Sequence, residues 1–174
     1  MNAFAHHNQR GDRRRGPQRA PREKSEFDSK LIDLARVARV TKGGKRFSFR
    51  ATMVIGDGKG RVGVAAAKGL DVVSAVEKAK RKAQKEMITV PIKNNRTINH
   101  DVEAKYSAAK VRIKPAGIGH GLIAGGACRV VLELAGIKDI SAKILGRTPN
   151  KMTNAMATIE ALKKLKLQYG TEQT

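Results

Sequence analysis

Glycines beside basic residues are the features whose types and spacing first suggest chemistry. Residues 58–63, GKGRVG, match the G-x-G-x-x-G pattern with which a loop holds a dinucleotide. That chemistry requires a helix directly after the loop, because the helix N-terminus receives the pyrophosphate. The alternation of Val62, Val64 and Ala66 predicts a strand there instead. We therefore interpret these glycines as turn residues, and the chain has no Walker sequence either.

A second glycine-rich segment, residues 117–126, contains too many glycines to form an element itself, and it leads into a helix predicted over residues 124–135 and ended by Gly136. Its backbone N–H groups could bind a phosphate oxygen at the helix N-terminus. Alternatively, the glycines allow the loop to pack closely against a neighbouring element. We favour close packing, and the two interpretations are compatible.

Catalytic and metal-binding groups are not evident in the sequence. No ligand spacing relates the cysteine and histidines to one another, namely Cys128, His6, His7, His100 and His120. Cys128 fits a small buried thiol, and we interpret Asp101 and Glu103 as a solvated strand face. With no nucleophile–base pair, we predict a protein that is not an enzyme and that has no metal site, cofactor or small-molecule substrate.

The charge is the strongest compositional signal. Among 174 residues, 36 Lys and Arg oppose 15 Asp and Glu, which gives a net charge of +21 and a pI near 10.7. Such an excess of positive charge indicates a polyanionic partner. No apolar run is long enough to span a membrane, no secretory h-region follows the basic N-terminus, and a single cysteine fits a reducing compartment. We expect a cytoplasmic protein.

A three-stranded sheet predicted over residues 36–63 positions many of the basic residues. Residues 46–55 alternate, with Phe47 and Phe49 on the apolar side and Arg46 and Arg50 on the other, as in a half-buried antiparallel strand. The turns at residues 42–45 and 56–60 carry the glycines that tight hairpins need. We expect the basic turns and the basic outer face to lie against phosphates.

Further elements complete two small α+β units. The helix over residues 70–87 is the clearest, with Asp71 as its N-cap and a basic outer face that suggests a second strip of contact. Residues 31–41 fit either a helix face or a strand, and we favour a strand because the segment runs directly into the first hairpin turn. Other elements are a strand at 88–92, a turn at 93–96, one or two strands in 97–115, a strand at 139–145, and a last helix with Thr148 as N-cap and Pro149 in its first turn. Residues 1–29 read as a disordered basic tail that either follows nucleic acid or is simply solvated.

The residue types present indicate that the expected polyanionic partner is folded RNA. Single-strand binders rely on exposed aromatic residues, whereas Phe47 and Phe49 are assigned to the core. No helix presents an Asn or Gln reading face for sequence-specific DNA binding. Basic turns and backbone contacts suit RNA that is recognised by shape and phosphate position.

The sequence also resembles the bacterial small-subunit ribosomal protein five family, over residues 30–165. The shared motifs are Lys42-Gly43-Gly44, Phe47-Ser48-Phe49, residues 54–58, residues 60–63, Pro115-Ala116, Gly119, residues 123–126 and Ala157-Thr158-Ile159. The resemblance implies a double-stranded-RNA-binding-like domain (30–93) and a C-terminal α+β domain of βαβ-type sandwich form (94–168). We expect tails at 1–29 and 169–174 on either side of these domains. It also implies binding to 16S-type ribosomal RNA beside ribosomal proteins four and eight, and roles in assembly and decoding accuracy near the messenger entry path and head–body neck. The Arg-rich tail before Ser29 is not part of the shared pattern, and the resemblance implies nothing about it.

The candidate RNA-binding residues combine the two turns with the basic strand face. They are Lys42, Gly43, Gly44, Lys45, Arg46, Arg50, Lys59, Arg61 and Lys68, supported by Arg112 and Arg129. The resemblance places a contact with protein four at Gly117, Ile118, Gly119 and His120, where His120 and Ile118 depart from the usual residues. The rival interpretations are a free-standing double-stranded-RNA binder or chaperone and an enzyme acting on a nucleotide.

Overall fold

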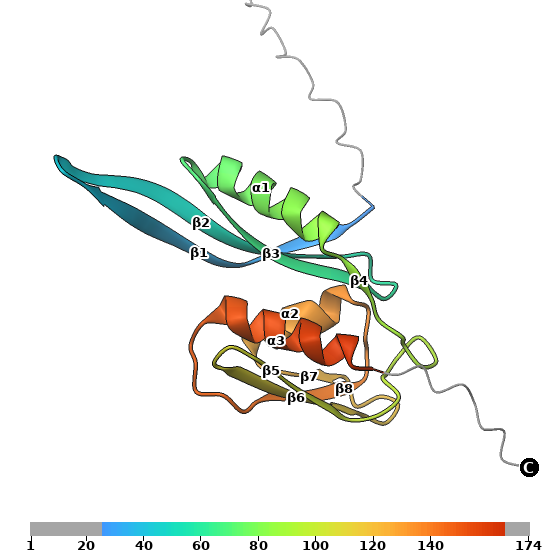
Figure 1. Cartoon of the computed structure of the whole chain (residues 1–174). Helices are drawn as coiled ribbons and strands as arrows, with labels where there is room; N and C mark the ends of the chain where they lie inside the picture. The colour runs from blue at the N-terminus through green and yellow to red at the C-terminus, as the bar shows by residue number, and fades with distance from the viewer. Residues whose placement is uncertain (1–25, 166–174) are drawn as a thin grey trace, which may run out of the picture.

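The computed structural model describes residues 26–165, which form two sheets and three helices arranged in layers (Figure 1). Helix α1 covers the outer face of the first sheet, and helices α2 and α3 lie between the two sheets. The elements are β1 (Asp28–Thr41), β2 (Gly44–Gly56), β3 (Arg61–Gly69), α1 (Val72–Lys85), β4 (Ile88–Thr89), β5 (Val102–Tyr106), β6 (Ala109–Pro115), β7 (Leu122–Ile123), α2 (Gly126–Leu134), β8 (Ile140–Ile144) and α3 (Lys151–Lys163).

The first sheet is antiparallel in the order β1-β2-β3-β4. Ala51 and Met53 on β2 pack against Ala75 and Ala79 on α1, as the alternation of β2 and the helix period require. The predicted N-cap is confirmed, since Asp71 accepts a hydrogen bond from the N–H of Val72 (2.8 Å) and forms a capping box with Ser74. The predicted strand at 31–41 lies within β1.

The second sheet has the order β5-β6-β8-β7. Strand β6 is antiparallel to β5 and β8, whereas β7 runs parallel to β8. We expected no strand within the glycine-rich segment at residues 117–126, and this expectation was wrong, because Leu122 and Ile123 form β7 and pair with Ile140 and Ser141. Two residues are too short for a periodic signal, so only the neighbouring strand reveals β7.

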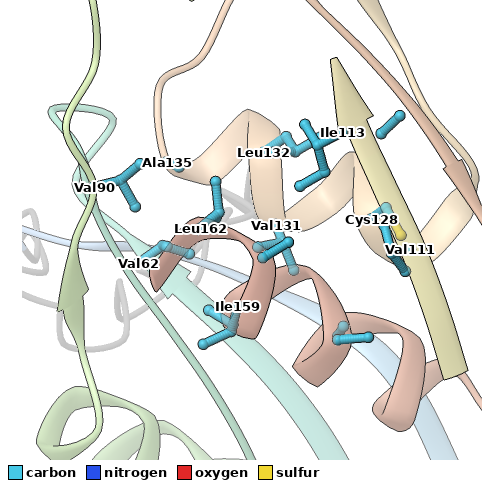
Figure 2. Close-up of a cluster of buried hydrophobic side chains, with 14 of the residues drawn as sticks. Val62, Val90, Val111, Ile113, Cys128, Val131, Leu132, Ala135, Ile159 and Leu162 are labelled. Carbon is cyan, nitrogen blue, oxygen red and sulfur yellow. The ribbon is translucent and has the colours of Figure 1, made fainter. Parts of the chain in front are cut away.

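One continuous core joins the two sheets. Val54, Val62 and Val64 of the first sheet belong to the same buried cluster as Val131 and Leu162 of the intermediate helices. Figure 2 shows Val62, Val131 and Leu162 of this cluster. The inner half of β2 is consequently buried on both faces, including Thr52, which alternation places on the same side of the strand as Arg46 and Arg50. The α+β fold with two units is confirmed, but the boundary at residues 93–94 and the other domain limits remain predictions.

The last helix begins later than the sequence suggested. Its N-cap is Asn150, whose side-chain oxygen accepts from the N–H of Met152 (3.1 Å), and not Thr148. Thr148 instead accepts from the N–H of Asn150 (3.3 Å), so both polar side chains shape the turn that leads into α3. Strand β1 starts at Asp28, within the range predicted as a tail, and residues 1–25 and 166–174 lie outside the described residues.

Candidate nucleic-acid interface

The β1–β2 hairpin forms an arm that projects past α1 and past the second unit (Figure 1). Every side chain from Thr41 to Phe47 is exposed, and a Cβ added at Gly43 would meet nothing within 4 Å. Between Leu34 and Gly56 the chain has no acidic residue but six basic ones: Arg36, Arg39, Lys42, Lys45, Arg46 and Arg50. Within residues 26–165 no ion pair involves any of the six. The arm thus carries uncompensated positive charge.

Strand pairing places like charges directly opposite one another. Arg39 is the register partner of Arg46, and Arg50 is the partner of Lys68. Arg46 and Arg50 are four residues apart on β2, so all four side chains lie on the sheet face opposite to α1. We call these four residues the basic row. Such pairs are unfavourable in the free protein and become favourable when an anion lies over them.

Arg50 adds a second indication of a missing partner. Its side chain is half-buried, and its Nε atom has no hydrogen-bond partner among the described residues. A buried donor without an acceptor is costly, and a phosphate oxygen would satisfy it. Arg39, by contrast, was missed as a candidate. The structure has a two-residue turn at residues 42–43 that places Arg39 opposite Arg46, whereas the turn expected over residues 42–45 would have placed Arg39 opposite Ser48.

Phe47 is not a core residue, contrary to the sequence interpretation. Its side chain is 50% exposed, with the Arg36 guanidinium 4.4 Å from the ring centroid. The physical reason is the length of β3, which ends at Gly69 opposite Phe49. Phe49 packs against the cluster beneath α1, whereas no third strand lies beside Phe47. Stacking of the guanidinium on the ring stabilises the arm.

The β2–β3 turn does not form a second free basic tip. The N–H groups of Gly58 and Gly60 donate to the carbonyl oxygens of Leu134 (3.1 Å) and Ala135 (2.9 Å), so the turn is docked on the end of α2. It lies at the opposite end of β2 from the arm tip, about 40 Å away for a strand of this length. Lys59 on this turn is exposed, but the structure does not bring it to the basic row.

Asp57 organises the docked turn and engages Arg61. Its carboxylate accepts from the backbone N–H groups of Lys59 (2.8 Å) and Arg61 (3.0 Å) and from Arg61 Nε (2.7 Å). Burial raises the pKa of Asp57, but these hydrogen bonds and the Arg61 charge outweigh it and hold the pKa below its usual value. Arg61 also lies over the Phe27 ring, 5.3 Å from its centroid. This guanidinium is occupied within the protein.

The two supporting arginines belong to the second unit. Arg112 pairs with Asp101 (2.8 Å), and this hydrogen bond lowers the pKa of the Asp101 carboxyl. Glu103 pairs with Lys110, so the carboxylates interpreted as a solvated face are ion-paired along β5 and β6. Arg129 is exposed on α2. Neither arginine is part of the basic row.

The loop at residues 117–121 is held by a buried carboxylate. Asp139 is 2% exposed and accepts from the N–H groups of Gly119 (3.2 Å) and Gly121 (3.0 Å) and from Arg96 Nε (2.9 Å). The hydrogen bond from Gly121 leads the effects that lower its pKa, against the raising effect of burial. These N–H groups are therefore not available to a phosphate. The residues predicted to contact a partner protein, from Gly117 to His120, are all exposed.

Close packing is also not the reason for most glycines of this segment. A Cβ added at Gly117, Gly119 or Gly121 would meet nothing within 4 Å. Gly119 and Gly121 instead have φ values of +86° and +77°, which favour glycine. Only Gly125 meets a neighbour, the Ile144 side chain, at 3.0 Å.

Metal and thiol chemistry find no support in the described part of the chain. No group of three or more His, Cys, Asp or Glu residues there could hold a metal ion, and His6 and His7 lie outside it. Cys128 is buried as predicted, receives a hydrogen bond from the Thr158 hydroxyl (3.0 Å), and has its pKa raised by burial. None of the helices within residues 26–165 is long and apolar enough to cross a membrane.

Fold and surface together define a two-unit α+β protein with an uncompensated basic arm. The models for "Ribosomal protein S5, N-terminal domain" and "Ribosomal protein S5, C-terminal domain" match residues 27–91 and 104–169. The chain is 49% identical to small ribosomal subunit protein uS5c of Cyanidium caldarium over 80% of this chain and 82% of that protein. It is 42% identical to small ribosomal subunit protein uS5 of Bartonella bacilliformis over 90% of this chain and 82% of that protein. The chain belongs to the ribosomal protein S5 family.

Membership of this family confirms two expectations from the sequence. The resemblance to small-subunit ribosomal protein five is correct, and it extends over both units. The protein is a member of a structural ribosomal family and is not an enzyme. The G-x-G-x-x-G segment accordingly forms a turn and the start of strand β3.

Proposed function

We propose that this protein is a structural constituent of the small ribosomal subunit that binds 16S-type ribosomal RNA through the β1–β2 arm. The observation that carries the proposal is the basic row, in which Arg39 faces Arg46 and Arg50 faces Lys68 without any acidic residue nearby on the arm. Phosphates neutralise such pairs, and RNA that is recognised by backbone position provides them at regular spacing. Lys42, Gly43, Gly44 and Lys45 form the tip that enters the RNA.

The finer roles follow from family membership. We propose that the arm reaches the head–body neck, that the protein contributes to assembly and decoding accuracy near the messenger entry path, and that it works in the cytoplasm beside ribosomal proteins four and eight. The loop from Gly117 to His120 is the proposed contact with protein four. In support, Asp139 fixes this loop while Ile118 at its tip is 84% exposed. Lys59, Arg61, Arg112 and Arg129 are secondary contacts in this proposal, and Arg61 and Arg112 would have to exchange their present partners.

A salt titration tests the arm directly. Replacing Lys45 and Arg46 with Ala is expected to flatten the dependence of log K on log salt by roughly two units, because each lost phosphate contact removes about one released counterion. The matched control replaces Lys105 and Lys143, two exposed lysines of the second sheet, with Ala. An unchanged slope for the arm variant, or an equal change for the control, would remove the arm from the contact surface.

Sedimentation distinguishes the ribosomal role from a free-standing RNA binder. The protein in a lysate is expected to co-migrate with the small ribosomal subunit through a gradient in moderately high salt. Recovery in the light fractions only, together with binding to RNA duplexes in general, would favour the free-standing binder.

A further inference from the structure

A cavity of about 600 Å³ lies where the two units meet. Its walls come from the docked β2–β3 turn, from the segment after β4, from the turn at residues 93–97 and from the chain that leaves α2. Lys59 from the first unit and Lys138 from the second both line it, with Asn95 between them in sequence and Val90 as an apolar wall. The volume is in the range of cavities that hold small ligands.

Both lysines are left without a counter-charge. Neither Lys59 nor Lys138 forms an ion pair with any described residue, and no carboxylate lines the cavity. The acidic residues closest to them in sequence are occupied elsewhere. Asp57 is bound by Arg61 and by two backbone N–H groups, and Asp139 is bound by Arg96, Gly119 and Gly121. The cavity is therefore positively charged and has no internal neutralising group.

The walls are fixed before any ligand arrives. Gly58 and Gly60 are hydrogen-bonded to the end of α2, and the N–H of Val90 donates to Gly60 (2.8 Å). A Cβ on Gly136 would lie 2.0 Å from the Gly58 carbonyl oxygen, which shows how closely the two backbones approach. The turn that carries Asn95 is closed by reciprocal backbone hydrogen bonds between Lys93 and Thr97 (2.8 and 3.1 Å). A preformed site loses little entropy when it binds.

We propose that this cavity binds a single phosphate group of an RNA strand, with Lys59 and Lys138 contacting it from opposite units. The inference rests on the proposed function, in which Lys59 is only a secondary contact, and adds to it a cavity at the far end of β2 from the arm in which Lys138 joins Lys59. The two ammonium groups supply charge, the Asn95 side-chain amide supplies a hydrogen-bond donor, and Val90 offers an apolar surface to the adjoining sugar. A strand bound here connects the two units, so RNA stabilises their interface.

Amide NMR of the full chain locates the site. We expect addition of a short RNA duplex to shift the backbone amides of Lys59, Asn95 and Lys138 more than those of Lys105 and Lys143. Inorganic phosphate is the second probe and is expected to shift the same amides at higher concentration. Shifts with phosphate but not with RNA would make this a site for a free anion and overturn the RNA assignment. Shifts spread evenly over all exposed lysines would overturn the site itself.

A double-mutant cycle tests whether the two lysines share one phosphate. The variants are Lys59→Gln, Lys138→Gln and the double variant, measured with a 16S-type ribosomal RNA transcript. If one phosphate is shared, the affinity loss of the double variant is smaller than the product of the two single losses, and the salt slope falls by roughly one unit and not two. Independent losses that equal those of Lys105→Gln and Lys143→Gln would contradict the proposal.

The same experiment separates this proposal from the function on which it rests. If the double variant binds RNA as the unchanged protein does while the variant of Lys45 and Arg46 binds weakly, the cavity site fails and the arm stands. If the unchanged protein does not bind the transcript, the proposed function fails.

Discussion

The two turns at the ends of β2 have similar compositions and opposite environments. The first, at residues 42–45, contains two glycines between lysines and projects into solvent on the arm. The second, at residues 56–60, contains three glycines, a lysine and Asp57, and it is docked on the end of α2. Glycine serves the first turn by permitting its conformation, whereas in the second it also permits contact between two backbones. The difference shows that a turn with glycines and lysines is available to bind a ligand only where no other part of the chain covers it.

The largest expected effect comes from adding a methyl group at Gly136, which follows α2 and packs against the docked turn. Gly136→Ala would force a residue with φ of +85° to hold a Cβ against the Gly58 carbonyl, and we expect a loss of ~3 kcal/mol in the free energy of unfolding. Gly43→Ala, which meets nothing at the free turn, is the control and is expected to stay within about 0.5 kcal/mol. Denaturant unfolding measures both, and equal losses would show that the two turns do not differ as described.

Removing the carboxylate that organises the docked turn has a smaller effect. Asp57→Asn weakens the bond to Arg61 and the acceptance of two backbone N–H groups, and we expect a loss of about 1–2 kcal/mol in the free energy of unfolding. RNA affinity at the arm should not change. Asp101→Asn, which breaks an exposed pair, is the control and should change the stability little.

The same carboxylate predicts a pH dependence. The folded pKa of Asp57 lies below its ordinary value of 3.8, so the folded state is the one that binds the proton less readily. Its stabilisation is complete above the unfolded value and is lost as the pH falls through the lower folded value. Unfolding measured across this acidic range should show a shallower loss for Asp57→Asn than for the unchanged protein. An identical pH profile would mean that Asp57 does not hold the turn.

The smallest expected effect on stability concerns the facing arginines of the arm. Arg46→Gln removes one of two facing guanidinium groups, so we expect it to raise the free energy of unfolding by ~0.5 kcal/mol while weakening RNA binding. Lys45→Gln, opposite Val40, relieves no like-charge pair and should raise the stability less. A loss of stability in Arg46→Gln would indicate that the two arginines do not repel each other in the free protein.

Local pattern predicted the elements that depend on neighbours in sequence. The alternation in β2, the Asp71 cap of α1 and the turn glycines all follow from residues a few positions apart, and the structure has them. The tip of the arm could be predicted for the same reason, since a hairpin turn and its charges are local. The role of Arg39 could not be predicted in this way, because its pairing with Arg46 depends on a two-residue turn at residues 42–43 and not on the turn expected over residues 42–45.

The features that the sequence did not predict depend on packing between residues far apart in the chain. Thr52 and Val54 are buried on the supposedly outer face because the second unit covers it, and no periodicity within β2 records that unit. Phe47 is exposed because β3 stops opposite Phe49, which depends on the length of another strand. Arg61 appeared available in the sequence but is engaged by Asp57 through the geometry of a turn that α2 holds in place.

The shared core also determines when the protein can complete its folding during synthesis. The face of the first sheet that carries Val54, Val62 and Val64 is covered by α2 and α3, and α3 extends to Lys163. The ribosome releases the chain from its N-terminus, so this apolar face emerges long before the helices that bury it. The apolar face of the first sheet therefore stays uncovered until α3 has left the exit tunnel.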